Sequence, residues 1–225
     1  HPAVVAAAAR LSQLGWQGLI WPVGPDGQLN MDLLEEMLAP PTQLVSLNWG
    51  QSEIGTLQPI LQIGEACRLR GILCHTDATQ LLSQARLDWR VLPLDLLSGS
   101  AHKFQGPRGV GLLLTRPEVL QQPIFGGGGQ QQGWRSGTEA IALTAGMAEA
   151  LAALPPHHPI TGSEAPAGLT PELRRCRDRL LDQLMERKGV QSTGAGPEQR
   201  LPHHISVVVS AADGQPVSGR ELVRQ

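Results

Sequence analysis

Short apolar runs alternate along the chain with segments whose apolar residues recur at helical spacing. Brief apolar runs bounded by turn residues are typical of buried strands, and we expect strands at residues 18–23, 43–48, 72–75, 94–98, 110–115 and 205–210. Helical spacing, with capping residues at several ends, predicts helices at residues 2–14, 30–38, 59–70, 138–154 and 170–188. A capping box that begins at Ser218 predicts one more helix.

Strands and helices in this order predict an α/β fold with a mainly parallel central sheet. A stretch rich in proline and glycine, residues 155–168, has the composition of a linker. We therefore expect a large domain over residues 1–154 and part of a smaller domain over residues 169–225. In parallel sheets, ligands bind at the carboxyl ends of the strands.

The composition excludes several classes of protein. The chain has 225 residues, 41% hydrophobic and 17% charged, which suffices for a core. Its formal net charge of -2, without a basic stripe, argues against a nucleic-acid partner. The longest apolar runs are far shorter than the about 20 residues that a membrane span needs. Three cysteines without a CxxC pair indicate neither a zinc site nor a disulfide framework, so we expect a reducing compartment and no metal.

The two ends of the sequence indicate a piece of a longer protein. The chain begins with His1 rather than methionine, and it ends at Gln225 inside the helix predicted to open at Ser218. No signal-peptide pattern is visible, so we expect a cytoplasmic protein.

Lysine is the most informative residue type. Of the 18 basic residues, 16 are arginine, and the two lysines are Lys103 and Lys188. Lys188 lies in a polar stretch at a predicted helix end, where a cation is favourable. Lys103 follows a predicted strand, and a lysine amine can form a Schiff base, which arginine cannot. A surface lysine in a loop is the alternative interpretation.

Asp77 is the second candidate, because it comes directly after the apolar strand at residues 72–75. It could cap the following turn, or it could face the cation of a cofactor; pyridoxal phosphate needs a carboxylate at its pyridine nitrogen. Gln80 could point into the same crevice or lie in solvent. Ser100 and His102 occupy alternate positions and could face one phosphate group. His75 is interpreted as a packed histidine at a strand end.

Several motifs occur in an order that resembles a known family. They are His1-Pro-Ala-Val, Ser52-Glu-Ile-Gly-Thr-Leu-Gln-Pro-Ile, His75-Thr-Asp-Ala-Thr-Gln, Ser100-Ala-His-Lys followed by Gly106-Pro, and Gly127-Gly-Gly with Arg135-Ser-Gly-Thr. Together they resemble the cysteine desulfurases of the NifS/IscS kind, which are class V aminotransferase-like enzymes of fold type I. The resemblance is strong over residues 1–154 and looser beyond. It implies the pyridoxal-phosphate transferase fold, with a smaller α+β domain at the C-terminal end.

The resemblance also implies roles for the candidate residues. Lys103 would hold pyridoxal 5'-phosphate and move the α-proton of the substrate, and Asp77 would pair with the ring nitrogen. The implied roles of the others are stacking on the ring and assisting proton transfer for His1, a hydrogen bond to the phenolic oxygen for Gln80, and phosphate binding for Ser100 and His102. Thr138 would reach the phosphate of a neighbouring subunit, so a homodimer is expected.

Two departures from the family pattern concern the same site. Ser52 stands where the family has an asparagine that contacts cofactor or substrate, and the shorter side chain shortens the reach. Residues 130–132 are all glutamine where the family usually has Gln-Glu-Arg.

The implied reaction is conversion of L-cysteine to L-alanine, with sulfur passed to an acceptor as a persulfide. In the family, the loop with the nucleophilic cysteine would follow residue 225, and none of Cys67, Cys74 or Cys176 matches it. We therefore expect this chain alone to be inactive. Two alternatives stay open: a selenocysteine lyase or another lyase of the superfamily, and a degenerate, non-catalytic homologue that serves as a partner or scaffold.

Overall fold

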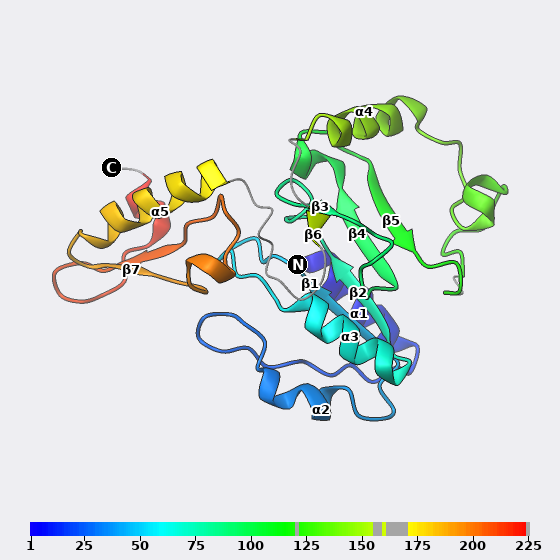
Figure 1. Ribbon diagram of the computed structural model, residues 1–225, viewed down its shortest axis with the longest axis horizontal. Helices are drawn as coiled ribbons and strands as arrows, with labels where there is room; N and C mark the ends of the chain where they lie inside the picture. Colours follow the sequence, from blue (N-terminus) through cyan, green and yellow to red (C-terminus); the bar gives the residue numbers. More distant parts are fainter. Residues whose placement is uncertain (120–121, 155–158, 161–170, 224–225) are drawn as a thin grey trace.

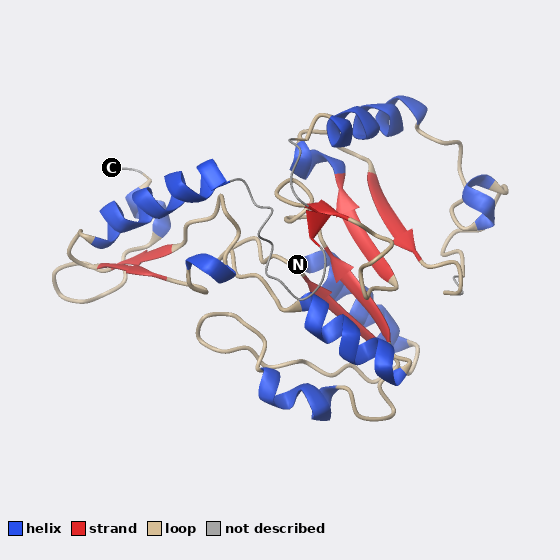
Figure 2. Ribbon diagram, in the orientation of Figure 1, coloured by secondary structure: helices blue, strands red, loops and turns tan. Residues whose placement is uncertain are grey.

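The centre of the molecule is a four-stranded sheet with the strand order β1-β2-β4-β5 (Figure 1). The computed structural model describes residues 1–119, 122–154, 159–160 and 171–223. The strands of this sheet are β1 (Leu44–Asn48), β2 (Leu73–Asp77), β4 (Leu96–Ser100) and β5 (Gly111–Thr115). β1, β2 and β4 run parallel, which confirms the predicted α/β fold with a mainly parallel sheet. Figure 2 shows the strands in red with the helices around them.

β5 runs antiparallel to β4. Residues 101–110 connect the two strands and contain one short 3-10 helix, η2 (Ala101–Phe104). A parallel return needs a crossover of a dozen or more residues, so this connection is too short for one. The short antiparallel connection instead places η2 directly at the carboxyl end of β4.

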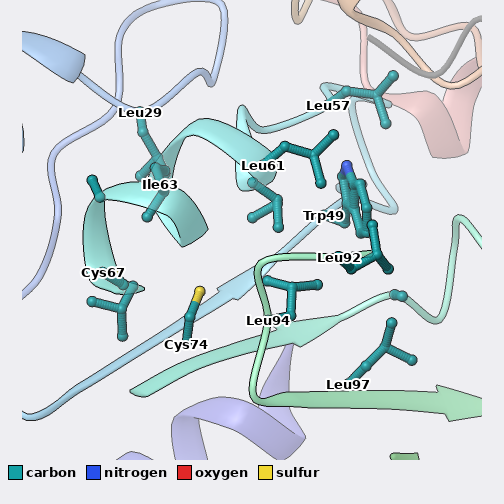
Figure 3. Close-up of a cluster of buried hydrophobic side chains, with 14 of the residues drawn as sticks. Leu29, Trp49, Leu57, Leu61, Ile63, Cys67, Cys74, Leu92, Leu94 and Leu97 are labelled. Carbon is teal, nitrogen blue, oxygen red and sulfur yellow. The ribbon is translucent and has the colours of Figure 1, made fainter. Parts of the chain in front are cut away.

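One face of the sheet forms the hydrophobic core. Helix α3 (Ile60–Arg70) covers it and begins after Pro59, while Gly71 ends the helix with a φ of 66°. Ile60, Ile63 and Cys67 recur at helical spacing and are at most 1% exposed. They face strand residues that include Cys74 and Leu97 (Figure 3). The expectation that Cys67 lies in an apolar helix stripe is confirmed.

The opposite face of the sheet is polar near the carboxyl ends of its strands. Strand register places six polar residues on it, and we call this set the polar face: Ser46, Asn48, His75, Asp77, Ser98 and Ser100. Alternation along each strand thus separates the packed core from the residues that the sequence marked for chemistry.

The N-terminal segments agree with most of the predicted helices. Helix α1 (Pro2–Gln13) begins at His1, which caps it. The predicted helix at 30–38 is divided into a 3-10 turn, η1 (Met31–Leu33), and α2 (Leu34–Met37), and the Asn30 side chain caps the first turn. The strand predicted at residues 18–23 is wrong. Only Val23 makes a bridge, to Leu29, and Ile20 is 91% exposed, so this apolar run has no neighbouring strand.

The following segments lead from the large sheet towards the C-terminal part. The 3-10 helix η3 (Gln130–Gly133) comes before α4 (Ile141–Ala152), which lies against η2. The two-residue strands β3 (Arg86–Leu87) and β6 (Pro159–Ile160) pair in parallel. β6 falls within the predicted linker, whose other residues lie outside the described ones, so the domain limits stay a prediction.

The C-terminal part lies to one side of the sheet and has the predicted α+β character (Figure 1). It contains α5 (Pro171–Met185), β7 (Val190–Ser192), η4 (Pro197–Gln199), β8 (Val207–Val209) and α6 (Gly219–Leu222). β7 and β8 pair antiparallel, and the capping box at Ser218 is present. Within the described residues, we find no helix with the length and apolar character needed to cross a membrane.

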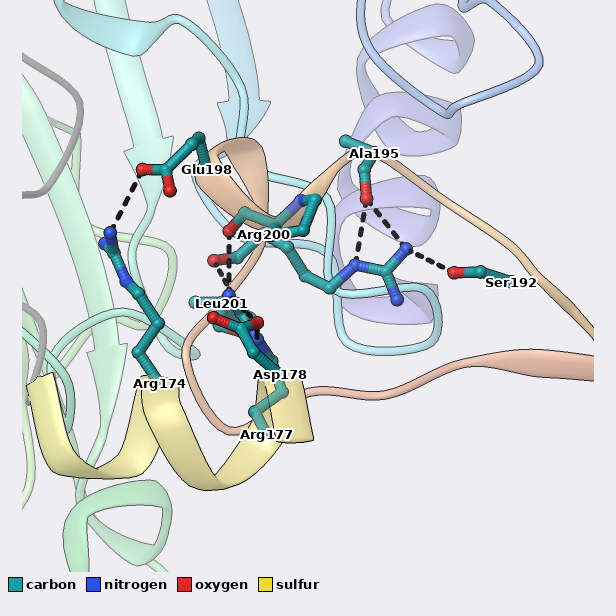
Figure 4. A network of polar contacts seen from close by, with 9 residues as sticks. Arg174, Arg177, Asp178, Ser192, Ala195, Glu198, Arg200 and Leu201 are labelled. Atoms are coloured by element: carbon teal, nitrogen blue, oxygen red, sulfur yellow. Dashed lines mark hydrogen bonds and ion pairs between the residues drawn. The ribbon is translucent and has the colours of Figure 1, made fainter. Parts of the chain in front are cut away.

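Buried arginines join the C-terminal part to the segment that returns to the large sheet (Figure 4). The Arg177 guanidinium is 3% exposed and donates hydrogen bonds to the carbonyl oxygens of Pro197, Arg200 and Leu201. Arg200 is 2% exposed and donates to the carbonyl oxygen of Ala195 at 2.9 Å. Because an unpaired buried guanidinium is costly, these contacts fix residues 193–201 firmly.

Candidate functional site

Asp77 and Ser100 end two neighbouring parallel strands at the same edge of the sheet. Both side chains are half-buried, and Asp77 lies opposite Ser98 in the register. The Asp77 carboxylate accepts a hydrogen bond from the backbone N–H of Thr79 at 2.9 Å, which shapes the turn that carries Gln80. Within the described residues, the Asp77 carboxylate has no ion pair. The sequence-based expectation that a strand ends at Asp77 is confirmed, but only one face of that strand is buried, since Leu73 is 38% exposed.

Lys103 and His102 lie on η2, directly after Ser100. Ala101 and Phe104 are 0% and 1% exposed and anchor this short helix in the interior. The side chains of His102 and Lys103, which lie between these two anchors, are exposed. Among the described residues, none forms a hydrogen bond or ion pair with the Lys103 amine. The fold therefore presents an accessible amine at the same sheet edge as the Asp77 carboxylate.

Ser52 lies in a tight turn that follows β1, the third strand to end at this edge. Gln51 Oε1 accepts the backbone N–H of Ile54 at 2.7 Å, and Gly55 adopts a φ of 76°. The buried Thr56 donates from Oγ1 to the carbonyl oxygen of Asp26 at 2.7 Å. These bonds hold the turn in one shape whatever the length of the Ser52 side chain.

The C-terminal part contacts this turn through a histidine that sequence reasoning did not connect with the site. His204 Nε2 donates to the Ser52 carbonyl oxygen at 2.9 Å, and the backbone N–H of Leu201 donates to the carbonyl oxygen of Gly55 at 2.8 Å. A Cβ at position 55 would stand 2.7 Å from the His204 ring, so the close approach depends on Gly55.

His203 lies in the same segment as His204, within range of the Lys103 charge. No spacing signal connects positions 103 and 203, because only the folded chain brings them together. In the described part of the chain, no cluster of His, Cys, Asp or Glu could hold a metal ion.

The remaining predicted site residues are Gln80, His1 and Thr138, and they differ in burial and in position. Gln80 is half-buried in the turn after β2, whereas His1 and Thr138 are exposed. His1 Nδ1 accepts the backbone N–H of Ala3 at 3.2 Å, so its ring caps α1. Thr138 lies in the irregular segment before α4. The structure therefore gathers Asp77, Gln80, Ser100, His102, Lys103 and the Ser52 turn at one edge, and gives no contact that joins His1 or Thr138 to them.

A family model, Aminotransferase class-V, matches residues 1–219, a range that spans both the sheet edge and the segment that carries His204. The chain belongs to the class V aminotransferase family. Among solved structures of similar fold, a NifS-like protein aligns with a TM-score of 0.80 and 31% identity, over 93% of this chain and 55% of that one. The fold type expected from the sequence motifs is thereby confirmed.

Two other similar proteins have names that concern cysteine. Cysteine desulfurase IscS 1 of Archaeoglobus fulgidus, a class V aminotransferase relative, is 36% identical over 219 residues, which are 96% of this chain and 54% of the relative. A structure entitled SspA in complex with cysteine aligns with a TM-score of 0.77 and 26% identity, over 100% of this chain and 59% of that one. The chain spans about half the length of the curated relatives it matches.

Proposed function

We propose that the site binds pyridoxal 5'-phosphate and that the protein is a cysteine desulfurase. The observation that carries the proposal is the pair of groups at the carboxyl ends of β2 and β4. Asp77 offers a carboxylate without a cation, and Lys103 offers an amine without a partner, within the described residues. A cofactor with a cationic ring nitrogen and a carbonyl carbon fits that donor set. Family membership supports the same cofactor.

Each residue of the edge has a role in this proposal. Bound pyridoxal phosphate supplies an electron sink for negative charge at the substrate α-carbon. Lys103 Nζ holds the cofactor and then carries the proton that leaves the α-carbon. Asp77 keeps the ring nitrogen protonated, and Gln80 binds the phenolic oxygen. Ser100 and His102 donate hydrogen bonds to the phosphate.

Three further residues complete the proposed site. His1 stacks on the ring and assists proton transfer, while the Ser52 turn borders the substrate. Thr138 reaches the phosphate of a second subunit, which makes a homodimer part of the proposal. The exposed position of Thr138 leaves it accessible to another copy.

The proposed reaction moves sulfur from L-cysteine to a thiol. The Cβ–S bond of cysteine breaks, the acceptor thiol becomes a persulfide, and L-alanine leaves with one added hydrogen on Cβ. Cys67 and Cys74 are 0% and 1% exposed, and hydrogen bonding to Cys67 and burial raise the pKa of Cys74. These two thiols are therefore unsuited as acceptors. In this proposal, the first acceptor is a cysteine of the full-length protein other than Cys67 and Cys74. That cysteine then passes the sulfur to a sulfur-acceptor protein.

A cytoplasmic location is also proposed. Its support is that the three cysteines, an odd number without a CxxC pair, do not form the disulfide framework of an oxidising compartment.

The test is formation of L-alanine and sulfide from L-cysteine by the full-length protein, with pyridoxal phosphate and a thiol reductant. We expect turnover in the wild type and in Lys188→Ala, and none in Lys103→Ala. Equal turnover in Lys103→Ala would contradict the assignment. Turnover of L-selenocysteine but not L-cysteine would favour the selenocysteine lyase, and failure to bind the cofactor at all would favour the non-catalytic homologue.

A further inference from the structure

A chain of side-chain hydrogen bonds crosses the polar face beneath the candidate site. His75 Nδ1 on β2 lies 2.8 Å from Ser46 Oγ on β1, and His75 Nε2 lies 3.2 Å from Ser98 Oγ on β4. Neutral imidazole has one donor and one acceptor nitrogen, and a serine hydroxyl can serve either. One side chain of the middle strand thereby ties together the strands on both sides of it.

We call the hydrogen-bonded set Ser46–His75–Ser98 the tie. Its position relates it to both charged groups of the site, Asp77 and Lys103. Asp77 follows His75 by two residues on the same face, and Ser98 is the Cα partner of Asp77. After Ser98, β4 ends at Ser100 and continues into η2 with Lys103. The bond between His75 and Ser98 therefore fixes the strand that carries Lys103 against the strand that carries Asp77, just before both strands end.

The charge of His75 matters because Asp77 is its charged neighbour. Burial lowers the pKa of His75, and the negative charge of Asp77 opposes that shift without reversing it. The contacts from β1 and β4 are serine hydroxyls, which carry no charge. A protonated His75 would compete with a cationic ring nitrogen for the Asp77 carboxylate. Neutral His75 leaves that carboxylate available.

We propose that His75 is a positioning residue of the site, which sets the spacing of Asp77 and Lys103 through Ser98 and leaves the Asp77 charge free for a cationic ligand. The inference rests on the proposed function. It replaces the sequence-based interpretation of His75 as a packed strand-end histidine with a specific task, which the cross-strand distances reveal.

The first test needs no cofactor. Amide hydrogen exchange is measured over residues 96–104 in the full-length wild type and in His75→Ala, Ser98→Ala and Thr115→Val. Thr115 also lies on the polar side of the sheet beside β4, but its hydroxyl bonds only to the carbonyl oxygen of Arg116. We expect faster exchange in His75→Ala and Ser98→Ala and wild-type exchange in Thr115→Val. Unchanged exchange in the first two variants, or an equal increase in all three, would overturn the tie.

The second test measures the affinity for pyridoxal phosphate against pH. At pH 8 we expect about tenfold weaker binding in His75→Ala, the loss of roughly one buried hydrogen bond. In His75→Gln, whose amide can bond both serines without charge, binding should stay within about threefold of wild type. The ratio of wild-type to His75→Gln affinity should be constant above about pH 6.5 and fall below it, as His75 becomes protonated. Taking this ratio removes the titration of the cofactor itself.

The outcomes separate this inference from the proposed function. A ratio that does not change with pH, or wild-type affinity in His75→Ala, would overturn the role of His75 while leaving the cofactor site intact. Absence of pyridoxal phosphate binding in the wild type would contradict the proposed function, and the exchange measurement would still decide whether the tie exists.

Discussion

At the residue scale, the site depends on charges that the rest of the chain leaves uncompensated. Among the described residues, Asp77 accepts one hydrogen bond, from the backbone of its own turn, and forms no ion pair. A carboxylate without a counter-charge among the described residues can pair with a bound cation. Its neighbours on the polar face are serine hydroxyls, the Asn48 amide and the His75 imidazole, none of them a carboxylate or a permanent cation. This arrangement favours a bound cationic group over a purely structural turn.

Asp77→Asn tests that interpretation. The amide can still accept the N–H of Thr79, but it cannot keep a ring nitrogen protonated. We expect kcat for L-cysteine to fall by orders of magnitude while some cofactor still binds. Asp213→Asn is the matched control, because Asp213 makes the same local bond, to the backbone N–H of Gln215, on the surface. If both variants keep near wild-type kcat, Asp77 is only a turn cap.

The sequence indicated the residues whose surroundings are local and missed those whose partners are distant. Asp77 and Lys103 follow apolar strands, so position along the chain already predicts the sheet edge. His204 contacts Ser52 across 152 positions, and no pattern in a single sequence encodes such a contact. The cross-strand bonds of His75 depend on strand register, which apolar periodicity leaves open.

At the element scale, the short helix η2 determines where Lys103 lies. The helix has four residues and gains little from its own hydrogen bonds, so its position depends on packing. Phe104, at 1% exposure, is its largest buried side chain. The two end residues of η2 are buried and its two middle residues, His102 and Lys103, are exposed.

Phe104→Ala should therefore affect stability and cofactor binding together. Loss of a buried aromatic side chain costs about 3–5 kcal/mol, and the cavity would free η2 to move Lys103. Phe125→Ala removes the only other phenylalanine, which is 60% exposed, and should change the free energy of unfolding far less. Chemical denaturation and a cofactor titration measure the two effects. Equal losses of stability in both variants would contradict the packing role.

The elements that the sequence predicted are those with a strong period or a clear cap. α3 and its Gly71 cap are one example, and the strands around Cys74 and Leu97 are another. The apolar run at residues 18–23 failed because a strand also needs a partner, and Leu19 and Ile20 are exposed instead. The paired β3 and β6 have two residues each, too few for any pattern. The direction of β5 depended on connection length rather than on its own residues.

At the scale of the whole molecule, the C-terminal part completes the edge built by the sheet. Arg177 and Arg200 hold residues 193–201 by backbone carbonyl oxygens, and the next residues reach Ser52 and Gly55. The chain thereby links a helix of the smaller part to a turn at the candidate site. Linkage of this kind predicts that a change in α5 alters the Ser52 turn.

Arg177→Met measures the strength of that linkage. Three carbonyl oxygens lose their donor, two of them in buried hydrogen bonds, so we expect a loss of about 3 kcal/mol in stability. Hydrogen exchange should rise both at residues 197–204 and at residues 51–57. Arg179→Met, an exposed neighbour on the same helix, should behave as wild type. Unaltered exchange at residues 51–57 in Arg177→Met would show that the two parts are not coupled.

The central claim is that Lys103 is the residue that holds the cofactor beside Asp77. The most direct measurement is peptide mass mapping after the full-length protein has been incubated with pyridoxal phosphate and reduced with borohydride, which makes a bond between cofactor and amine permanent. We predict the added mass on the peptide that contains Lys103 and none on the peptide that contains Lys188, the only other lysine of the chain. A label confined to Lys188 or to any amine other than Lys103, or no label on the protein, would contradict the account.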